Sequence, residues 1–311
     1  MIDICAIIIN YNTASYTIGC INSLLENTST QTSYELVIVD NNSSFEDYST
    51  LKKHIGTVND YRVKLVRSKQ NIGFGAGNML GVQHTSPCKY YAFINNDTLM
   101  VSKDCLGGLK LFMQQTPDAG ICSPQMLDED KNFRVTIDHY SSLKREIFRR
   151  PLLERLFPTT YLNRKQRFEQ PTVVHYVQGS FMFVDAASFN MIGGFDTNLF
   201  LFYEESDLSL RMTKKSNKNT YIVPSLEYIH YKSASMNKNI YLKMEQKISL
   251  LYHTQKHYGS IQRAVLNSYF CIRYFFTALI KPSYWRLFVL LLEGAPLSKS
   301  LKLKQQINEE I

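Results

Sequence analysis

Several residue patterns that mark common protein classes are missing from this chain of 311 residues. Its six cysteines are scattered, with no CxxC pair and no zinc-like spacing, which favours a reducing compartment. No apolar run reaches the roughly 18–20 residues that a membrane span needs. The start of the chain, MIDICAIIINYNT, lacks the basic segment of a signal peptide and instead predicts a strand. We therefore expect a cytoplasmic protein.

Two familiar nucleotide-binding motifs are absent as well. The glycines of NIGFGAGN (71–78) do not have the GxGxxG spacing, and the chain has no Walker GK[ST]. This segment also follows the third expected strand rather than the first, so an oxidoreductase of the simple dinucleotide-binding type is disfavoured. Its glycines would still let the backbone approach a ligand closely, and a helix starting just beyond them would favour phosphate.

Acidic residues are fewer than basic residues in this chain. The chain has 35 Lys and Arg against 27 Asp and Glu, a net charge of +8 and a pI near 9.0. This balance indicates an anionic partner, which could be nucleic acid, a phosphorylated ligand or anionic lipid. A hydrophobic content of 44% and a charged content of 20% fit a folded globular protein with a sizeable core.

Short apolar runs alternate with helical patterns over the first hundred residues. This alternation predicts a parallel sheet with helices on both faces, and such sheets bind ligands at the carboxyl ends of their strands. The expected strands are ICAIIIN (4–10), YELVIVD (34–40), VKLVRS (63–68) and YYAFINND (90–97), with helices at 14–28, 45–56 and 76–85.

Polar residues follow each of these four strands. In a parallel sheet they collect on one rim, and four successive clusters favour a ligand site even though each alone could cap a helix or form a turn. The candidate binding residues on this rim are Asn10, Asn12, Asp40, Asn42, Asn71, Gly73, Asn78, Asn95, Asn96 and Asp97.

The candidate metal ligands and catalytic residues are three carboxylates and one histidine. Asp97 could hold a divalent cation that bridges a diphosphate, because the phosphates supply other oxygens, or it could cap a turn. Glu204 and Glu205 open an expected helix, where acids are ordinary, but the preceding aromatic run FLFY can raise the pKa of a carboxylate that serves as a base. His230 becomes a candidate ligand only if it meets Asp97 around a metal.

The middle and the end of the chain are more basic. Residues 127–172 contain few strand patterns, and we expect a loosely helical excursion over the site. The tail, 240–311, is expected to be helical, with the apolar stretches YFFTALI (274–280) and YWRLFVLLL (284–292) among basic residues. That mixture suits helices in a membrane interface, or equally a cap that packs on the domain. The basic residues of the excursion are Lys144, Arg145, Arg149, Arg150, Arg155, Arg164, Lys165 and Arg167.

Taken together, these motifs resemble glycosyltransferase family 2, in its bacterial rhamnosyltransferase-like branch. The resemblance covers about residues 3–236 and implies a GT-A fold, with a nucleotide-binding half (1–100) and an acceptor-binding half (101–239). The motifs that carry it are AIIINYNT (6–13), LVIVDNNSS (36–44), NIGFGAGNMLG (71–81), YYAFINNDT (90–98), QGSFMFVDAASFNMIGGFDTNLFLFYEESDLSLRM (178–212) and IHYKSAS (229–235).

The resemblance also implies an activity. It implies inverting transfer of a sugar from a nucleoside diphosphate sugar, with Mg²⁺ or Mn²⁺ as cofactor. The branch favours dTDP-rhamnose as donor and a lipid-linked or growing saccharide as acceptor, in O-antigen or capsule synthesis. The enzyme would then act peripherally at the cytoplasmic face of the inner membrane.

Residue roles carry over only at matching positions. Asp40 should contact the nucleotide base or ribose, with the other rim amides and Gly73 near the nucleotide sugar. Asn95-Asn96-Asp97 resembles the DXD position, with Asp97 as metal ligand and His230 completing the site. Glu205 matches the catalytic base, and Glu204 is the alternative. The chain departs from the family in having Asn95 for the first acid of DXD and Glu in place of the more usual Asp at the base.

Two other functions are compatible with the same rim. A nucleotidyltransferase acting on sugar phosphates would also use a parallel sheet and a metal-bound carboxylate, but no basic glycine-rich loop follows the first strand. A non-catalytic module could bind a nucleotide or polyanion through its positive charge, but no aromatic-basic RNA motif is present, so nucleic acid is not expected as a partner.

Overall fold

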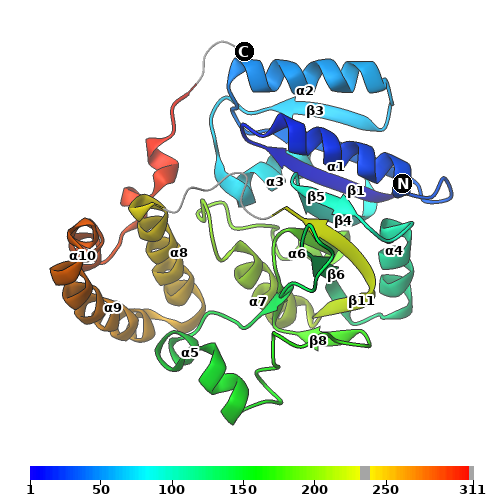
Figure 1. Cartoon of the computed structure of the whole chain (residues 1–311). Coiled ribbons are helices and arrows are strands. Elements are labelled where there is room, and N and C mark those ends of the chain that lie inside the picture. The colour runs from blue at the N-terminus through cyan, green and yellow to red at the C-terminus, as the bar shows by residue number, and fades with distance from the viewer. Residues whose placement is uncertain (232–238, 308–311) are drawn as a thin grey trace.

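A nine-stranded sheet forms the centre of the computed structural model, which describes residues 1–231 and 239–307 (Figure 1). The strand order is β3-β2-β1-β4-β10-β6-β11-β5, with β8 paired to β11. The end of the IHYKSAS motif, from Lys232, lies outside the described residues. The N-terminal part contributes β1 (Ile2–Asn10), α1 (Ala14–Asn27), β2 (Tyr34–Asp40), α2 (Phe45–Val58), β3 (Val63–Arg67), α3 (Gly73–Gln83), β4 (Cys88–Asn95) and β5 (Thr98–Met100).

The predicted parallel arrangement of the first four strands is confirmed. β1 pairs in parallel with β2 and β4, and β2 pairs in parallel with β3. Alternate residues of β1 enter different apolar clusters, because successive side chains of a strand point to opposite faces: Ile4 and Ile8 lie in one, Cys5 and Ile7 in the other. Burial on both faces explains why these strands are continuous apolar runs.

The second part of the chain makes the sheet mixed. β10 runs antiparallel to β4 and β6, whereas β11 runs parallel to β6 and antiparallel to the short β5. β7 and β9 form a separate two-stranded sheet. The elements of this part are α4 (Cys105–Gln115), β6 (Ala119–Leu127), β7 (Ile137–Asp138), α5 (Leu143–Leu156), β8 (Thr172–Val174), β9 (Tyr176–Val177), β10 (Phe181–Asp185), α6 (Ala186–Met191), α7 (Glu204–Ser216) and β11 (Asn219–His230).

The glycine-rich segment packs against protein rather than framing an open loop. α3 begins at Gly73, three residues earlier than expected. Gly73 has φ +84°, and a Cβ there would lie 2.3 Å from the carbonyl oxygen of Phe200. The amide of Phe74 donates to that same oxygen at 3.0 Å. The missing side chain therefore lets α3 dock on the loop that leads into α7.

The basic excursion contains one interrupted helix. α5 is broken at Arg149, whose φ of 62° and ψ of 159° are not helical, and Pro151 removes a backbone donor just beyond. The prediction of a loosely helical segment is confirmed in this respect.

The tail is helical, as predicted, and has its own apolar cluster. It consists of α8 (Ile240–Tyr258), α9 (Ser260–Ile280) and α10 (Trp285–Leu292), followed by short 3₁₀ turns. Leu251, Phe270 and Leu290 are buried among these helices. Within the described residues, no helix is long and apolar enough to cross a membrane. In Figure 1 the three helices lie to one side of the sheet, with α5 beside α9.

A buried carboxylate joins the tail to α7. Asp207 accepts from Arg211 of the same helix at 2.6 Å and from Lys256 and His257 of α8 at 2.6 and 2.7 Å. Burial raises the pKa of Asp207, but donation from His257, Arg211 and Lys256 outweighs burial and holds the pKa well below its usual value. The ionised form of Asp207 therefore stabilises the packing of α8 against α7.

We predict that Asp207→Asn lowers the free energy of unfolding at pH 7 by about 3 kcal/mol, because it leaves the buried Arg211 without its counter-charge. Since the folded pKa is depressed, this contribution is present above the unfolded pKa of about 4 and is lost as pH falls below it. Urea unfolding at pH 7 and at about pH 2.5, below the unfolded pKa, measures both effects. The exposed Asp130→Asn is the control, and an equal loss in the two variants would contradict the prediction.

Candidate active site

A cleft of about 360 Å³ opens where the carboxyl end of β4, the end of β11 and the start of α7 meet α5. Four residues predicted from the sequence line it: Asn95, Glu204, Glu205 and His230. The other lining residues are Phe74, Asp138, Arg145, Arg150, Tyr176, Gln178, Gly179, Ser180, Leu201, Phe202, Tyr203 and Gln246.

Asp97 contacts His230, which lines this cleft. Antiparallel pairing of β5 with β11 sets Thr98 opposite His230, which brings Asp97 Oδ1 within 3.1 Å of His230 Nε2. The Asn95 amide lies 3.4 Å from the same nitrogen. One carboxylate and one imidazole fit a divalent cation whose other ligands come from a diphosphate. Among the described residues no group of three or more His, Cys, Asp or Glu could hold a metal, so the protein alone offers an incomplete ligand set.

Glu205 is held at the start of α7 by a backbone donor. Gly179 N donates to Glu205 Oε1 at 3.0 Å, and a Cβ on Gly179 would lie 2.6 Å from that oxygen. Burial raises the pKa of Glu205, the amides of Glu205 and Gly179 lower it, and the charge of Asp138 raises it further. Gly179 is thus a contact that the sequence did not reveal, although it lies inside a recognised motif.

Glu204 has a different environment. Its side chain is 3% exposed, and Oε1 has no hydrogen-bond partner among the described residues. Burial, followed by the neighbouring charge of Glu205, raises the pKa of Glu204 well above the usual carboxyl value. Glu204 therefore retains its proton to a higher pH than an ordinary carboxyl group, and it lies beside a carboxylate that has a backbone donor.

The polar residues at the ends of β1 and β2 bond to other side chains of the protein. Asn10 Nδ2 donates to Asp40, Ser43 and Asp47 at 3.0, 3.0 and 2.8 Å, and Asp40 is an ion-pair partner of Arg67. Asn10 and Asp40 are both fully buried. The structure gathers them at the carboxyl ends of β1 and β2, as predicted, but not among the residues that line the cleft.

The remaining rim amides mostly fix the backbone. Asn12 Oδ1 accepts from Ser44 N, and Asn42 Nδ2 donates to the carbonyl of Gln306. Asn71 Oδ1 accepts from Asn41 and from Gly73 N, while Asn78 donates to the Phe74 carbonyl within α3. Asn96 turns away from the cleft and donates to Thr13 and Thr17 of the α1 region. These contacts leave Asn95 as the rim amide beside His230.

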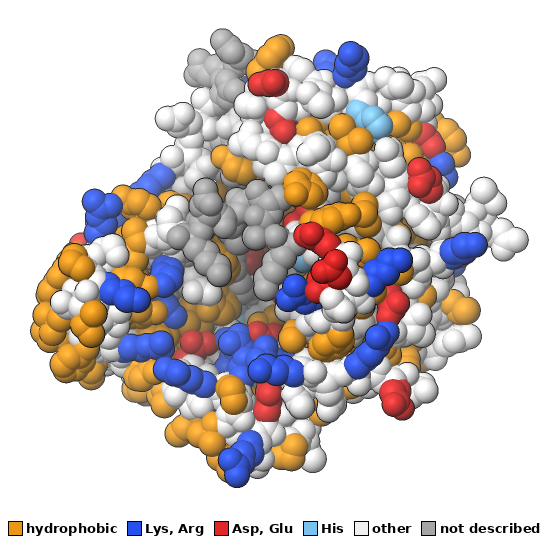
Figure 2. Space-filling model, in the orientation of Figure 1, with side chains coloured by type: hydrophobic (Ala, Val, Ile, Leu, Met, Phe, Trp, Pro, Cys, Tyr) orange, Lys and Arg blue, Asp and Glu red, His pale blue; other side chains and the backbone are white. Residues whose placement is uncertain are grey.

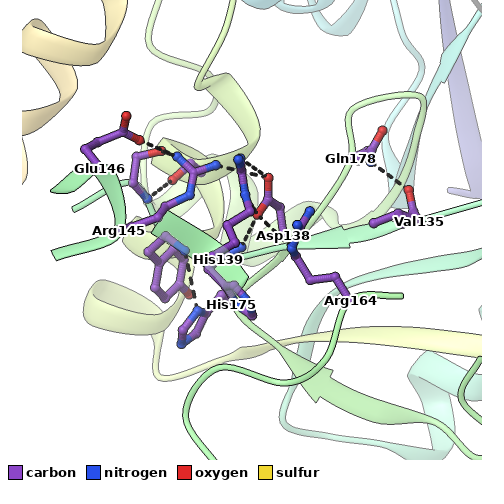
Figure 3. A network of polar contacts seen from close by, with 12 residues as sticks. Val135, Asp138, His139, Arg145, Glu146, Arg164, His175 and Gln178 are labelled. Atoms are coloured by element: carbon purple, nitrogen blue, oxygen red, sulfur yellow. Dashed lines mark hydrogen bonds and ion pairs between the residues drawn. The ribbon is translucent and has the colours of Figure 1, made fainter. Parts of the chain in front are cut away.

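An ionic network forms another wall of the cleft, and the sequence indicated only its basic members. Figure 3 shows Arg145 and Arg164 directed toward Asp138, with Glu146 on the far side of Arg145. Asp138 lies on β7, a two-residue strand that the sequence did not suggest, and it comes close to Glu205 only through the fold.

Comparison with known proteins gives one family. The sequence of residues 5–192, from β1 to the end of α6, matches the protein family described as glycosyl transferase family 2. The N-acetylglucosaminyl-diphospho-decaprenol L-rhamnosyltransferase of Mycobacterium tuberculosis is 25% identical over 212 residues, which cover 63% of this chain and 68% of that protein. Rhamnosyltransferase WbbL of Escherichia coli K12 is 26% identical over 219 residues, covering 68% of this chain and 78% of WbbL.

Solved structures share the fold at 14% identity. GalNAc-T7 with UDP, GalNAc and Mn²⁺ superposes with a TM-score of 0.62 over 82% of this chain, which spans about half (48%) of that protein. Mannosyltransferase PcManGT from Pyrobaculum calidifontis, with GDP-Man and Mn²⁺, gives 0.56 over 95% of this chain and 88% of that one. S. aureus TarS 1–349 superposes with a TM-score of 0.54, over 85% of this chain and 68% of that one. The predicted GT-A fold is confirmed by these structures.

We predict that Glu204→Gln changes how stability depends on pH. A raised folded pKa means that the stability contribution of Glu204 is complete below its unfolded pKa of about 4.3 and is lost as pH rises toward the folded pKa. Gln does not titrate, so the variant should gain stability relative to wild type as pH rises above the unfolded pKa of about 4.3, by about 1.4 kcal/mol per pH unit until the folded pKa is reached. Denaturant unfolding measures this. The exposed Glu26→Gln should show no such trend, and a constant difference for Glu204→Gln would refute the assignment.

Proposed function

Because this chain belongs to glycosyl transferase family 2, we propose that it transfers rhamnose from dTDP-rhamnose, with inversion, to a lipid-linked or growing saccharide acceptor. Family membership makes it a glycosyltransferase, as predicted, and favours sugar transfer over the nucleotidyltransferase and binding-module alternatives. Two relatives named as rhamnosyltransferases support rhamnose, and the diphospho-decaprenol in one name supports a lipid-linked acceptor. We infer a place in bacterial surface polysaccharide synthesis, such as O-antigen or capsule, from the branch alone.

The observation that carries this proposal is the position of Glu205. Its carboxylate lies in the same cleft as Asn95 and His230 and is oriented by Gly179 N. A raised pKa suits a general base, since the carboxylate is then a better proton acceptor for the acceptor hydroxyl that attacks the anomeric carbon. Inversion follows when that hydroxyl attacks from the face opposite the leaving nucleoside diphosphate.

Asp97 and His230 would hold Mg²⁺ or Mn²⁺, whose charge would offset the charge that develops on the leaving diphosphate. Asn95 would hydrogen-bond the donor without adding negative charge. The presence of Mn²⁺ in two structures with the same fold supports a divalent cation for this chain. The buried cluster of Asn10 and Asp40 would shape the nucleotide pocket by fixing the loops after β1 and β2, and we propose that exposed atoms of these loops contact the base and ribose.

We predict metal-dependent release of nucleoside diphosphate from dTDP-rhamnose when a donor panel is assayed with a membrane lipid extract. Glu205→Gln should lower kcat by at least about 10²-fold and leave donor affinity within twofold, because only proton removal is lost. Asp97→Asn should raise the metal concentration that gives half-maximal activity. Glu26→Gln is the matched control. Full activity of Glu205→Gln would reject Glu205 as the base, and release from another sugar only would reject rhamnose.

A second part of the proposal concerns the membrane. α9 and α10 carry exposed apolar side chains, and Figure 2 shows them grouped over these helices beside a band of Lys and Arg. Arg273, Lys281 and Arg286 are exposed among them. Apolar side chains flanked by basic ones fit an anionic bilayer surface, and we propose that this face rests on the inner membrane. The exposed apolar residues are Ile261, Val265, Ile272, Phe275, Phe276, Leu279, Ile280, Trp285, Val289 and Leu292.

We predict that the protein sediments with phosphatidylglycerol-containing vesicles and shifts the fluorescence of its single tryptophan, Trp285, to shorter wavelength. Phe276→Asp should weaken binding about tenfold or more, because a charge replaces a buried ring. Phe45→Asp, at a ring on α2 that is even more exposed, should have no effect. Absence of vesicle binding by the intact protein at low salt would refute the membrane contact.

A further inference from the structure

Two arginines of α5 line the same cleft as Glu205. Arg145 is 5% exposed, donates to Asp138 at 3.0 Å and to Glu146 at 2.7 Å, and has an Nε without an acceptor among the described residues. Arg150 is more accessible, with a side chain 36% exposed. It donates to both oxygens of Asp138, at 2.6 and 2.5 Å. A guanidinium has five N–H donors, so Arg150 keeps donors for an anion in the cleft.

Basic and acidic side chains form one network around these arginines, in which Arg145 also pairs with Glu146 and Arg164 with Glu154. Asp138 is shared among Arg145, Arg150 and Arg164, the last at 3.7 Å. Lys247 of α8 lies nearby, with Nζ 3.9 Å from the ring centre of Phe270 and no carboxylate within ion-pair distance among the described residues. Burial lowers the pKa of Lys247 to about 8, which leaves it mostly charged at pH 7. The donors of Arg150 that Asp138 does not use therefore remain available to an anionic ligand.

Local backbone geometry places Arg150. The helix is interrupted at Arg149, directly before it, so Arg150 is positioned by its two bonds to Asp138 rather than by a continuous helix. Asp138 in turn sits on β7, which pairs with β9. This anchoring presents a fixed guanidinium to the cleft, and fixed planar donors suit the geometry of phosphate oxygens.

Building on the proposed function, we infer that Arg145 and Arg150 form a subsite for the diphosphate of a prenyl-diphosphate-linked acceptor. The acceptor sugar is joined directly to that diphosphate, so its hydroxyl must reach Glu205 while the diphosphate lies within the same cleft. The donor diphosphate has a separate place at Asp97 and His230.

The surface beyond the arginines fits the rest of such an acceptor. α5 packs against α9, and α5 carries exposed Phe148, Leu152 and Leu156. A prenyl chain leaving the cleft past Arg150 would meet these side chains and then the apolar face of α9 and α10. The exposed apolar side chains of α5 would thus receive the first part of the prenyl chain.

The full-length protein should be titrated calorimetrically with farnesyl diphosphate and with farnesol, in EDTA to keep the diphosphate from binding through a metal. Wild type should bind farnesyl diphosphate at least about tenfold more tightly than farnesol. Arg150→Lys should lose less than Arg150→Gln, which loses about tenfold for farnesyl diphosphate only, because lysine keeps the charge but not the planar fork. Lysine can still pair with Asp138, so a loss confined to Arg150→Gln separates lost binding from misfolding.

The control is Arg155→Gln, an exposed arginine on the same helix that does not line the cleft. Equal losses in Arg150→Gln and Arg155→Gln would show general charge attraction and overturn the subsite. A loss of nucleoside diphosphate affinity with Mn²⁺ in Arg150→Gln, of the same size, would assign the arginines to the donor instead.

The proposed subsite and the proposed transfer reaction are tested by different outcomes. Sugar transfer by wild type without Arg150-dependent binding of farnesyl diphosphate would reject the subsite and keep the reaction. Arg150-dependent binding without turnover of any donor would keep the subsite and reject the reaction.

Discussion

The buried carboxylate of Asp207 is the constraint on which the arrangement of the cleft depends. A charge removed from water is tolerated only when cations and donors surround it, and Asp207 draws these from Arg211, Lys256 and His257. Arg211 also donates to the carbonyls of Ile192 and Gly194. One carboxylate therefore ties α7 both to the loop after α6 and to the tail.

This tie has a consequence for catalysis. α7 begins with Glu204 and Glu205, so its position determines where the proposed base lies. Two of the three side chains that donate to Asp207 come from α8, so the tail contributes to that position as well as to the proposed membrane face. We propose that the tail acts on the reaction by holding α7, in addition to any contact with lipid.

Local sequence patterns predicted the strands of the sheet better than they predicted the side-chain contacts between its elements. Continuous apolar runs indicated β1, β2 and β4, because strands covered on both faces need such runs. Parallel order then placed polar residues at one edge, and Asp97 did meet His230. The uses of Asn10 and Asp40 were not visible, because their partners Asp47 and Arg67 depend on how α2 and β3 pack.

The cationic wall shows a second limit of the sequence. Basic residues at 144–167 were evident, but Asp138, which collects three of them, lies on a two-residue strand with no recognisable pattern. Gly179 was likewise hidden, because its contact with Glu205 spans 26 positions and depends on how β10 and α7 meet. Contacts between distant segments follow from tertiary packing, which local periodicity does not encode.

The structure also bears on which of the two adjacent glutamates suits the role of base. Two carboxylates in one small cleft do not ionise independently, because each charge raises the pKa of the other. The proton is retained where the ionised form is least stabilised. Glu204 is the more buried and has an oxygen without a partner among the described residues, whereas Glu205 accepts from Gly179 N. The arrangement therefore favours a neutral Glu204 and an ionised Glu205, which is the division that a single proton transfer from an acceptor hydroxyl requires.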